Sequence, residues 1–150
     1  MAPANATDDA LLATFRRLGE VHTQLDGRLG AAVEARCGIP LAWFDVLSHL
    51  GGSNDGQLTM GELVERLGLT TGGVTRLVDR IESAGLVSRR PSSTDRRVAY
   101  AVISRVGRAK LRQASGVHAE NLRAVFADFS DRELAVLDRL LGRLRAADDG

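Results

Sequence analysis

The side chains most able to do chemistry are threonines and arginines that follow one another between residues 70 and 97. A helix is predicted to begin at Thr70 or Thr71, and its first turn carries short polar side chains that can approach nucleic-acid bases and phosphates. Arginines follow on its outward face, and an arginine can donate to two guanine acceptors in the major groove or to phosphate oxygens. The predicted DNA-contacting residues are Thr70, Thr71, Gly72, Thr75, Arg76, Arg80, Arg89, Asp95, Arg96 and Arg97.

The second basic feature is an arginine-rich turn. Asp95-Arg96-Arg97 lies between two segments of strand composition, so we expect it at the tip of a β-hairpin. The minor groove is narrow and strongly negative over A-tracts, and a guanidinium on a thin hairpin fits it well. We expect Asp95 to pair with Arg97 and hold the tip in shape, while one of the arginines enters the groove. The alternative is a charged turn that binds nothing.

Charge is distributed unevenly along the chain. The formal net charge is only +1 at pH 7, but residues 86–112 hold eight cations and one anion, which is a local charge of +7. A local basic excess on an otherwise balanced protein is typical of a DNA-binding face. Charge alone is equally consistent with a solvated basic surface. It therefore supports DNA binding only together with the motifs described above.

These side chains need rigid elements to position them, and the sequence predicts a helix–turn–helix followed by a β-hairpin. Thr59 and Glu62 fit a capping box that begins a helix running to Leu67, and Gly68 suits a left-handed position at its end. The next helix has an apolar face and ends at Gly85. The predicted strands span residues 86–90 and 98–103, and residues 91–95 form the turn between them.

Further helices are predicted on both sides of this lobe. Residues 8–36 carry apolar side chains at alternating spacings of four and three, a heptad seam typical of a helix that packs on a partner helix. The seam consists of Leu11, Phe15, Leu18, His22, Leu25 and Leu29. Helices are also predicted at 41–50, at 105–128 after a Ser104 cap, and after a capping box at residues 130–133. The expected fold class is mainly α with a small β-hairpin wing.

Several function classes find no support in the sequence. It contains no phosphate-binding glycine loop, no GxSxG and no HExxH, so we expect no catalytic residues, no enzymatic activity and no cofactor. The three histidines and the single cysteine form no close-spaced pair of metal ligands. The first residues do not resemble a signal peptide and no apolar run reaches membrane-spanning length, so we expect a cytoplasmic protein with no membrane partner.

Two segments resemble the MarR family of winged-helix transcription regulators, and the resemblance extends over nearly the whole chain. They are VTRLVDRIESAGLVSRR at Val74–Arg90 and STDRRVAYAVIS at Ser93–Ser104. Asp95 and Arg97 match the family's wing aspartate and arginine. Family members often begin the helix after the wing with Leu-Thr, and Ile103-Ser104 stands in its place here; serine caps a helix as well as threonine.

The resemblance implies how the protein binds DNA. It implies an obligate homodimer that puts each recognition helix in a major groove of double-stranded DNA and each wing in the adjacent minor groove. A two-fold dimer then reads a pseudo-palindromic operator with half-sites ~10 bp apart. The expected parts are a dimerisation helix at 1–36, the winged helix–turn–helix lobe at 40–103, dimerisation helices at 104–147 and a tail at 148–150.

The resemblance also implies regulation, most often repression that a small aromatic or anionic effector relieves. The candidate ligand-binding residues are Arg16, His22, Trp43, Asp45 and His49, with Arg17 beside them. A purely structural role for these residues is the alternative reading. Three other functions stay open: redox sensing through Cys37, metal sensing by ligands from distant segments, and non-specific architectural DNA binding.

Overall fold

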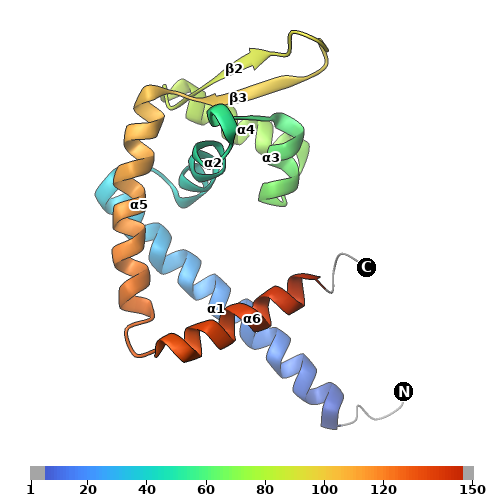
Figure 1. The fold of residues 1–150 in the computed structure, drawn as a ribbon, viewed down its shortest axis with the longest axis vertical. Helices are drawn as coiled ribbons and strands as arrows, with labels where there is room; N and C mark the ends of the chain where they lie inside the picture. The colour runs from blue at the N-terminus through green and yellow to red at the C-terminus, as the bar shows by residue number, and fades with distance from the viewer. Residues whose placement is uncertain (1–5, 147–150) are drawn as a thin grey trace. The chain divides into compact units, whose positions relative to one another are not determined.

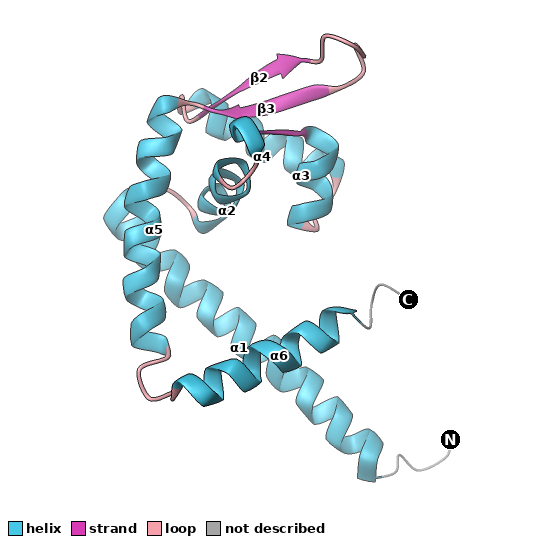
Figure 2. Cartoon of the chain, viewed as in Figure 1, coloured by secondary structure: helices cyan, strands magenta, loops and turns pink. Residues whose placement is uncertain are grey.

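A computed structural model describes residues 6–146, so the predicted tail at 148–150 lies outside the described residues. It confirms a mainly helical fold with one small antiparallel sheet (Figures 1 and 2). The elements in chain order are α1 (Ala6–Cys37), α2 (Leu41–Gly51), a 3₁₀ turn η1 (Asn54–Gly56), β1 (Gln57–Thr59), α3 (Met60–Leu67), α4 (Thr71–Ser83), β2 (Val87–Pro91), β3 (Ala99–Ile103), α5 (Arg105–Val125) and α6 (Asp131–Ala146). The chain forms two compact units, which divide within α5 after His118.

The first unit has a single hydrophobic core, to which α2, α3 and α4 each contribute apolar side chains. The largest fully buried side chains are Val33, Val46, Leu47, Leu50, Leu63, Val74, Val78 and Ile81. Two polar contacts hold the end of α1 against α5, since Lys110 Nζ donates to the Cys37 carbonyl at 2.9 Å and Gln113 Nε2 to the Arg36 carbonyl at 3.4 Å. The lobe that carries the predicted DNA contacts is therefore anchored on a well-packed interior.

The sheet has three strands in the order β1-β3-β2, which is one more than the sequence predicted. Leu58 of β1 pairs with Ala101 of β3, and both are buried. β1 is only three residues long and directly precedes a capped helix, so its sequence is too short to display a strand alternation. The strand forms because β3 offers it a free edge, and the wing hairpin thereby gains a broader base.

The second unit begins near the end of α5 and contains α6. α5 ends at Val125 rather than at the predicted Asp128, because the chain turns at Phe126, whose ring packs edge-on against Phe129 with centroids 5.6 Å apart. The predicted capping box is present: Glu133 N donates to Ser130 Oγ at 3.3 Å, and Ser130 N donates to the Glu133 carboxylate at 2.9 Å. None of the residues of α6 is buried within the chain.

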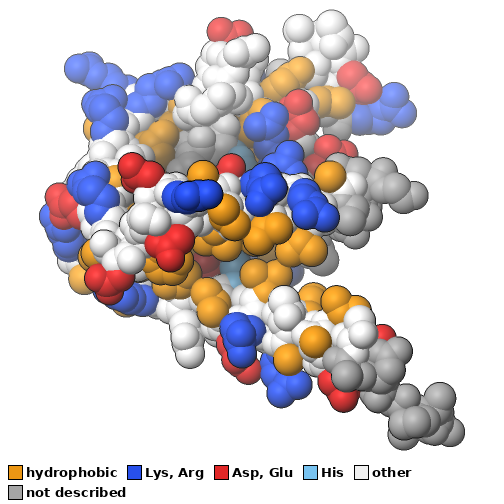
Figure 3. Space-filling model, turned by 60° about the horizontal axis from the view of Figure 1, so that its bottom comes forward, with side chains coloured by type: hydrophobic (Ala, Val, Ile, Leu, Met, Phe, Trp, Pro, Cys, Tyr) orange, Lys and Arg blue, Asp and Glu red, His pale blue; other side chains and the backbone are white. Residues whose placement is uncertain are grey.

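The predicted heptad seam on α1 is buried only toward its C-terminal end. Leu29 is buried, whereas Leu11 and Phe15 are 64% and 78% exposed. Hydrophobic side chains also lie open to solvent among charged ones in Figure 3. The exposed large hydrophobic residues of α1 and α6 are Leu11, Leu12, Phe15, Leu18, Val21, Val136, Leu137, Leu140, Leu141 and Leu144. Within residues 6–146, no helix is long and apolar enough to cross a bilayer.

Candidate nucleic-acid interface

The predicted helix–turn–helix is formed by α3 and α4, and both predicted caps of α3 are present. Thr59 Oγ1 accepts from Glu62 N at 3.1 Å, and the Glu62 carboxylate accepts from Thr59 N at 2.7 Å. The Thr59 hydroxyl also donates to the Glu62 carboxylate at 2.9 Å, and the bonds donated by the backbone and then by the hydroxyl of Thr59 lower the pKa of Glu62 below its usual 4.5. Gly68 then adopts a left-handed conformation with φ of 63°, which ends the helix and redirects the chain.

The recognition helix α4 begins with a polar turn and is anchored by an apolar face. Thr70 is its N-cap, and the Thr70 hydroxyl accepts from Gly73 N at 3.1 Å. Val74, Val78 and Ile81 are fully buried. The flank away from the core carries the predicted contacts Thr71, Gly72, Thr75, Arg76 and Arg80, and all of them are exposed. α4 thus presents a polar face with free amides at its start, which is the arrangement that a groove-reading helix needs.

The wing hairpin consists of β2 and β3, and its tip is held by local hydrogen bonds. The predicted pairing is present: the Asp95 carboxylate accepts from Arg97 N at 2.9 Å, from Arg97 Nε at 3.2 Å and from Arg97 Nη2 at 3.3 Å. The side-chain bonds from Arg97, followed by its backbone bond, lower the pKa of Asp95 below its usual 3.8. Asp95 is therefore ionised at neutral pH, the form that accepts these bonds from Arg97.

Two guanidinium groups project from this tip. The Arg97 side chain is 90% exposed although it is paired with Asp95, so its outer edge can still donate to a nucleic acid. Arg96 is exposed and makes no hydrogen bond or ion pair with the described residues. The wing is therefore a thin projection with two arginines at its end, as a minor-groove contact requires.

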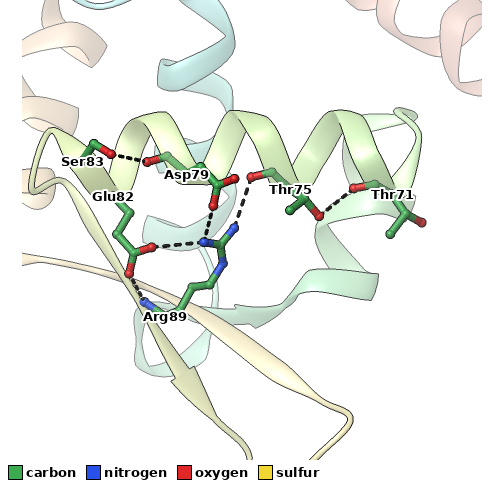
Figure 4. Close-up of polar contacts among 6 residues, drawn as sticks. All are labelled: Thr71, Thr75, Asp79, Glu82, Ser83 and Arg89. Carbon is green, nitrogen blue, oxygen red and sulfur yellow. Dashed lines mark hydrogen bonds and ion pairs between the residues drawn. The ribbon is translucent and has the colours of Figure 1, made fainter.

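Arg89 behaves differently from the other predicted contacts, because its guanidinium points back toward α4 (Figure 4). It donates to Asp79, to Glu82 and to the carbonyl oxygen of Thr75. The sequence reasoning did not single out Asp79 or Glu82. A signal for them existed, since the two acids lie three residues apart on one flank of a predicted helix that a strand must pack beside.

The candidate effector residues are brought together only in part. Asp45 and His49 lie one turn apart on α2, and Trp43 packs half-buried against the core. Partial burial, then the charge of Asp26, raises the pKa of Asp45 above its usual 3.8, while His49 and His118 oppose the shift. Arg16 and His22 lie on the exposed part of α1, and neither makes a hydrogen bond or ion pair with the described residues.

Comparison with known proteins then identifies the family. A model of the MarR family matches residues 38–98. An uncharacterised HTH-type transcriptional regulator of Bacillus subtilis, YcgE, is 31% identical over 129 residues, which cover 86% of this chain and 80% of YcgE.

The chain belongs to the MarR family.

Further relatives and solved structures are similar to the chain. The HTH-type transcriptional repressor YetL of B. subtilis is 32% identical over 101 residues, covering 67% of this chain and 60% of YetL. The fold matches the MarR-family regulator AbsC of Streptomyces coelicolor with a TM-score of 0.85 at 22% identity, over 100% of this chain and 99% of AbsC. It also matches a mutant E. coli MarR complexed with operator DNA, with a TM-score of 0.81 at 25% identity, over 91% of this chain and 96% of that protein.

Family membership settles the broad class of function. MarR-family proteins are DNA-binding transcriptional regulators, and they are not enzymes. This confirms the expectation, drawn from the missing catalytic motifs, that the chain has no enzymatic activity.

Proposed function

We propose that this MarR-family protein is a sequence-specific regulator that reads double-stranded DNA with α4 and the wing together. One observation carries the proposal: the exposed polar turn of α4 and the arginines of the wing tip belong to the same compact unit. Arg76 and Arg80 are suited to base edges or phosphates of the major groove. Arg96 and Arg97 are suited to the minor groove, where a narrow groove concentrates negative potential.

The proposed active form is a homodimer. α1 and α6 each expose large apolar side chains. Phe15 of α1 is 78% exposed, and Leu144 of α6 is 60% exposed. Several large apolar side chains left exposed on one helix are typical of an interface, because leaving them in water is unfavourable. The spacing of these residues on α1 also fits helix–helix packing. A two-fold dimer would place two recognition helices ~10 bp apart on a pseudo-palindromic operator.

The proposed mode of regulation is repression in the cytoplasm, relieved by a small aromatic or anionic effector. The relative YetL is described as a repressor, which supports this choice over activation. The group around Asp45 is the best-supported place for an effector, since the charges of His49 and His118 both act on Asp45 and His118 Nδ1 is buried with no hydrogen-bond partner among the described residues. An effector would act by binding more tightly to one separation of the two recognition helices.

The effector proposal has its own test. Trp43 lies on α2 with Asp45 and His49, so a Trp43→Phe variant should respond to releasing ligands at a higher concentration than the wild type does. An unchanged response to every ligand that releases the wild type would remove Trp43 from the proposed pocket.

Redox sensing is less well supported than ligand sensing. Cys37 is only 5% exposed and belongs to the hydrophobic core of the first unit. Reactive cysteines are partly exposed and lie near cations, whereas buried ones are generally inert. Peroxide treatment is therefore expected to leave DNA affinity unchanged.

A binding titration tests the proposed function. Purified protein is titrated with the DNA upstream of its own coding region and with a scrambled duplex of equal length, at physiological salt. We expect a preference of about a hundredfold or more for the upstream DNA, the range of sequence-specific regulators. Equal affinity for that duplex and the scrambled one, and for every duplex tested from the genome, would instead support a non-specific architectural protein with a steep salt dependence.

A further inference from the structure

The contacts of Arg89 join the wing to the recognition helix. Arg89 Nη1 donates to Asp79 Oδ1 at 2.5 Å and to Glu82 Oε2 at 3.1 Å, and its Nη2 donates to the Thr75 carbonyl oxygen at 3.1 Å. Its backbone N–H donates to Glu82 Oε1 at 2.9 Å, so both the backbone and the side chain of Arg89 are fixed to one flank of α4 (Figure 4). Arg89 pairs with Ala101 in the centre of the hairpin, which carries this constraint into both wing strands.

We propose that Arg89 is a positioning residue that sets where the wing stands relative to the recognition helix, and that it acts through Asp79 and Glu82 rather than by touching DNA. The inference rests on the proposed function, since it concerns how the two DNA-reading elements are held in register. It reassigns Arg89, which the sequence predicted as a DNA contact, and it gives a role to two acidic residues on a helix that approaches a polyanion.

The chemistry of the three side chains favours this role over a phosphate contact. Arg89 is only 27% exposed, and its donors already point at three acceptors on α4. Asp79 and Glu82 together outweigh its charge, so the cluster has a formal net charge of −1 and would repel a phosphate. Two uncompensated acids beside a DNA-reading helix would oppose DNA binding, and Arg89 neutralises them in part.

The contact with Thr75 makes the positioning specific. Thr75 is an exposed residue in the second turn of α4, and its hydroxyl donates to the Thr71 carbonyl at 2.9 Å. Arg89 therefore bonds to the same backbone stretch that presents the candidate base-reading side chains. Only the planar fork of an arginine can reach two carboxylates and a carbonyl at once, whereas a lysine ammonium is a compact point charge.

The two roles predict effects of opposite sign, and this difference makes the test sharp. The probe is the duplex best enriched by the wild-type protein from a random-sequence pool, and a scrambled duplex of equal length is the reference. If Arg89 is a positioning residue, Asp79→Asn and Glu82→Gln should each lower the preference for the selected duplex, because they release Arg89 from α4. If Arg89 is a phosphate contact, the same substitutions should raise the affinity for both duplexes, because they remove negative charge and free a guanidinium for DNA.

We expect Arg89→Met to lower the preference for the selected duplex about tenfold, and we expect Arg89→Lys to restore little of it. Combining Arg89→Met with Asp79→Asn should cost no more than Arg89→Met alone, because the two substitutions break the same contact. An equal loss of affinity for both duplexes in Arg89→Met, with a salt slope smaller by about 0.9, would overturn the inference and identify a phosphate contact.

Two control variants match the charge changes. Arg90 is the next residue of β2, and its Nη2 donates to Gln57 Oε1 at 2.7 Å, so Arg90→Met removes a hydrogen-bonded arginine that does not contact α4. Glu65 is exposed on α3 and forms no ion pair with the described residues, so Glu65→Gln removes an acid without releasing Arg89. Neither control should change the ratio of the two affinities, and a change as large as that of Arg89→Met would overturn the inference.

A measurement without DNA separates this inference from the proposed function. Hydrogen exchange of the β2 amides should be faster in the Asp79→Asn Glu82→Gln double variant than in the wild type, and unchanged exchange would overturn the inference. Asp79 is 54% exposed and the Asn side chain has the same shape, so loss of folding is not expected to obscure the result. A wild-type protein that enriches no sequence from the pool would contradict the proposed function, while the exchange result would still decide the role of Arg89.

Discussion

Replacing Gly107 by alanine should destabilise the protein, although alanine is normally the better residue within a helix. Gly107 lies buried in the first turn of α5, close to the backbone of Leu86 just before β2. A Cβ at position 107 would lie 2.0 Å from the Leu86 carbonyl oxygen and 3.0 Å from a side-chain carbon of Ile103. To reach an ordinary separation of about 3.4 Å, the carbonyl would have to retreat by about 1.4 Å. That carbonyl accepts from Ser104 N at 3.0 Å, so the movement would break a hydrogen bond that joins the wing to α5.

The expected size of the effect follows from these contacts. Overpacking costs about 1–3 kcal/mol, and the lost hydrogen bond costs about 1 kcal/mol. The gain in helix propensity from glycine to alanine returns about 1 kcal/mol. The net expectation is a loss of about 2 kcal/mol, which for a chain of this length lowers Tm by roughly 4–8 °C.

Thermal unfolding followed by circular dichroism, at one fixed protein concentration, measures this effect. The matched control is Gly116→Ala in the same helix, where an added Cβ meets nothing within 4 Å. This control should raise the stability by about 0.5–1 kcal/mol. A Gly107→Ala variant as stable as the Gly116→Ala variant would refute the reasoning, since it would mean that the α5 start and Leu86 separate at little cost.

Three further predictions concern the wing, the helix cap and the dimer. Asp95→Asn removes the charge that holds Arg97, so it should lower DNA affinity about tenfold with little change in Tm. In the wild type, the Asp95 pKa lies below 3.8. A pH titration followed by NMR should therefore show the Asp95–Arg97 pair intact at neutral pH and lost only as the pH falls through that lowered pKa. Thr59→Ala should lower the free energy of unfolding by about 0.5–2 kcal/mol at pH 7. Part of this difference from the wild type should vanish as the pH falls through the lowered pKa of Glu62, below 4.5, because protonated Glu62 no longer accepts the bonds that Thr59 donates. Leu140→Arg puts a charge on the exposed apolar face of α6, so sedimentation should show a monomer for the variant and the proposed dimer for the wild type. A variant that still dimerises would remove α6 from the interface.

Local signals made the helix–turn–helix and the wing tip predictable. The capping box of Thr59 and Glu62 operates over three residues, and the pairing of Asp95 with Arg97 over two. In both cases the partners are neighbours in the chain, so the sequence alone brings the groups together. The left-handed Gly68 is likewise a property of one residue.

Features that depend on distant segments were not predictable in the same way. β1 forms because β3 pairs with it, with Gln57 opposite Val102. The three residues of β1 carry no pattern from which this distant partner could be predicted. The contacts of Arg89 with Asp79 and Glu82 likewise depend on the packing of β2 beside α4, which brings together residues that are ten and seven positions apart in the chain. The direction of a side chain is set by the neighbouring element as well as by its own strand.

The most direct test of the central account is a methylation-interference experiment on the selected duplex. Dimethyl sulfate modifies guanine N7 in the major groove and adenine N3 in the minor groove, so one reagent reports on both grooves. The account predicts guanine interference in two clusters about one helical turn apart, from the two α4 helices, with adenine interference in the minor groove beside each cluster, from the two wings. Interference at one groove only, or at no defined position, would contradict joint reading of DNA by α4 and the wing.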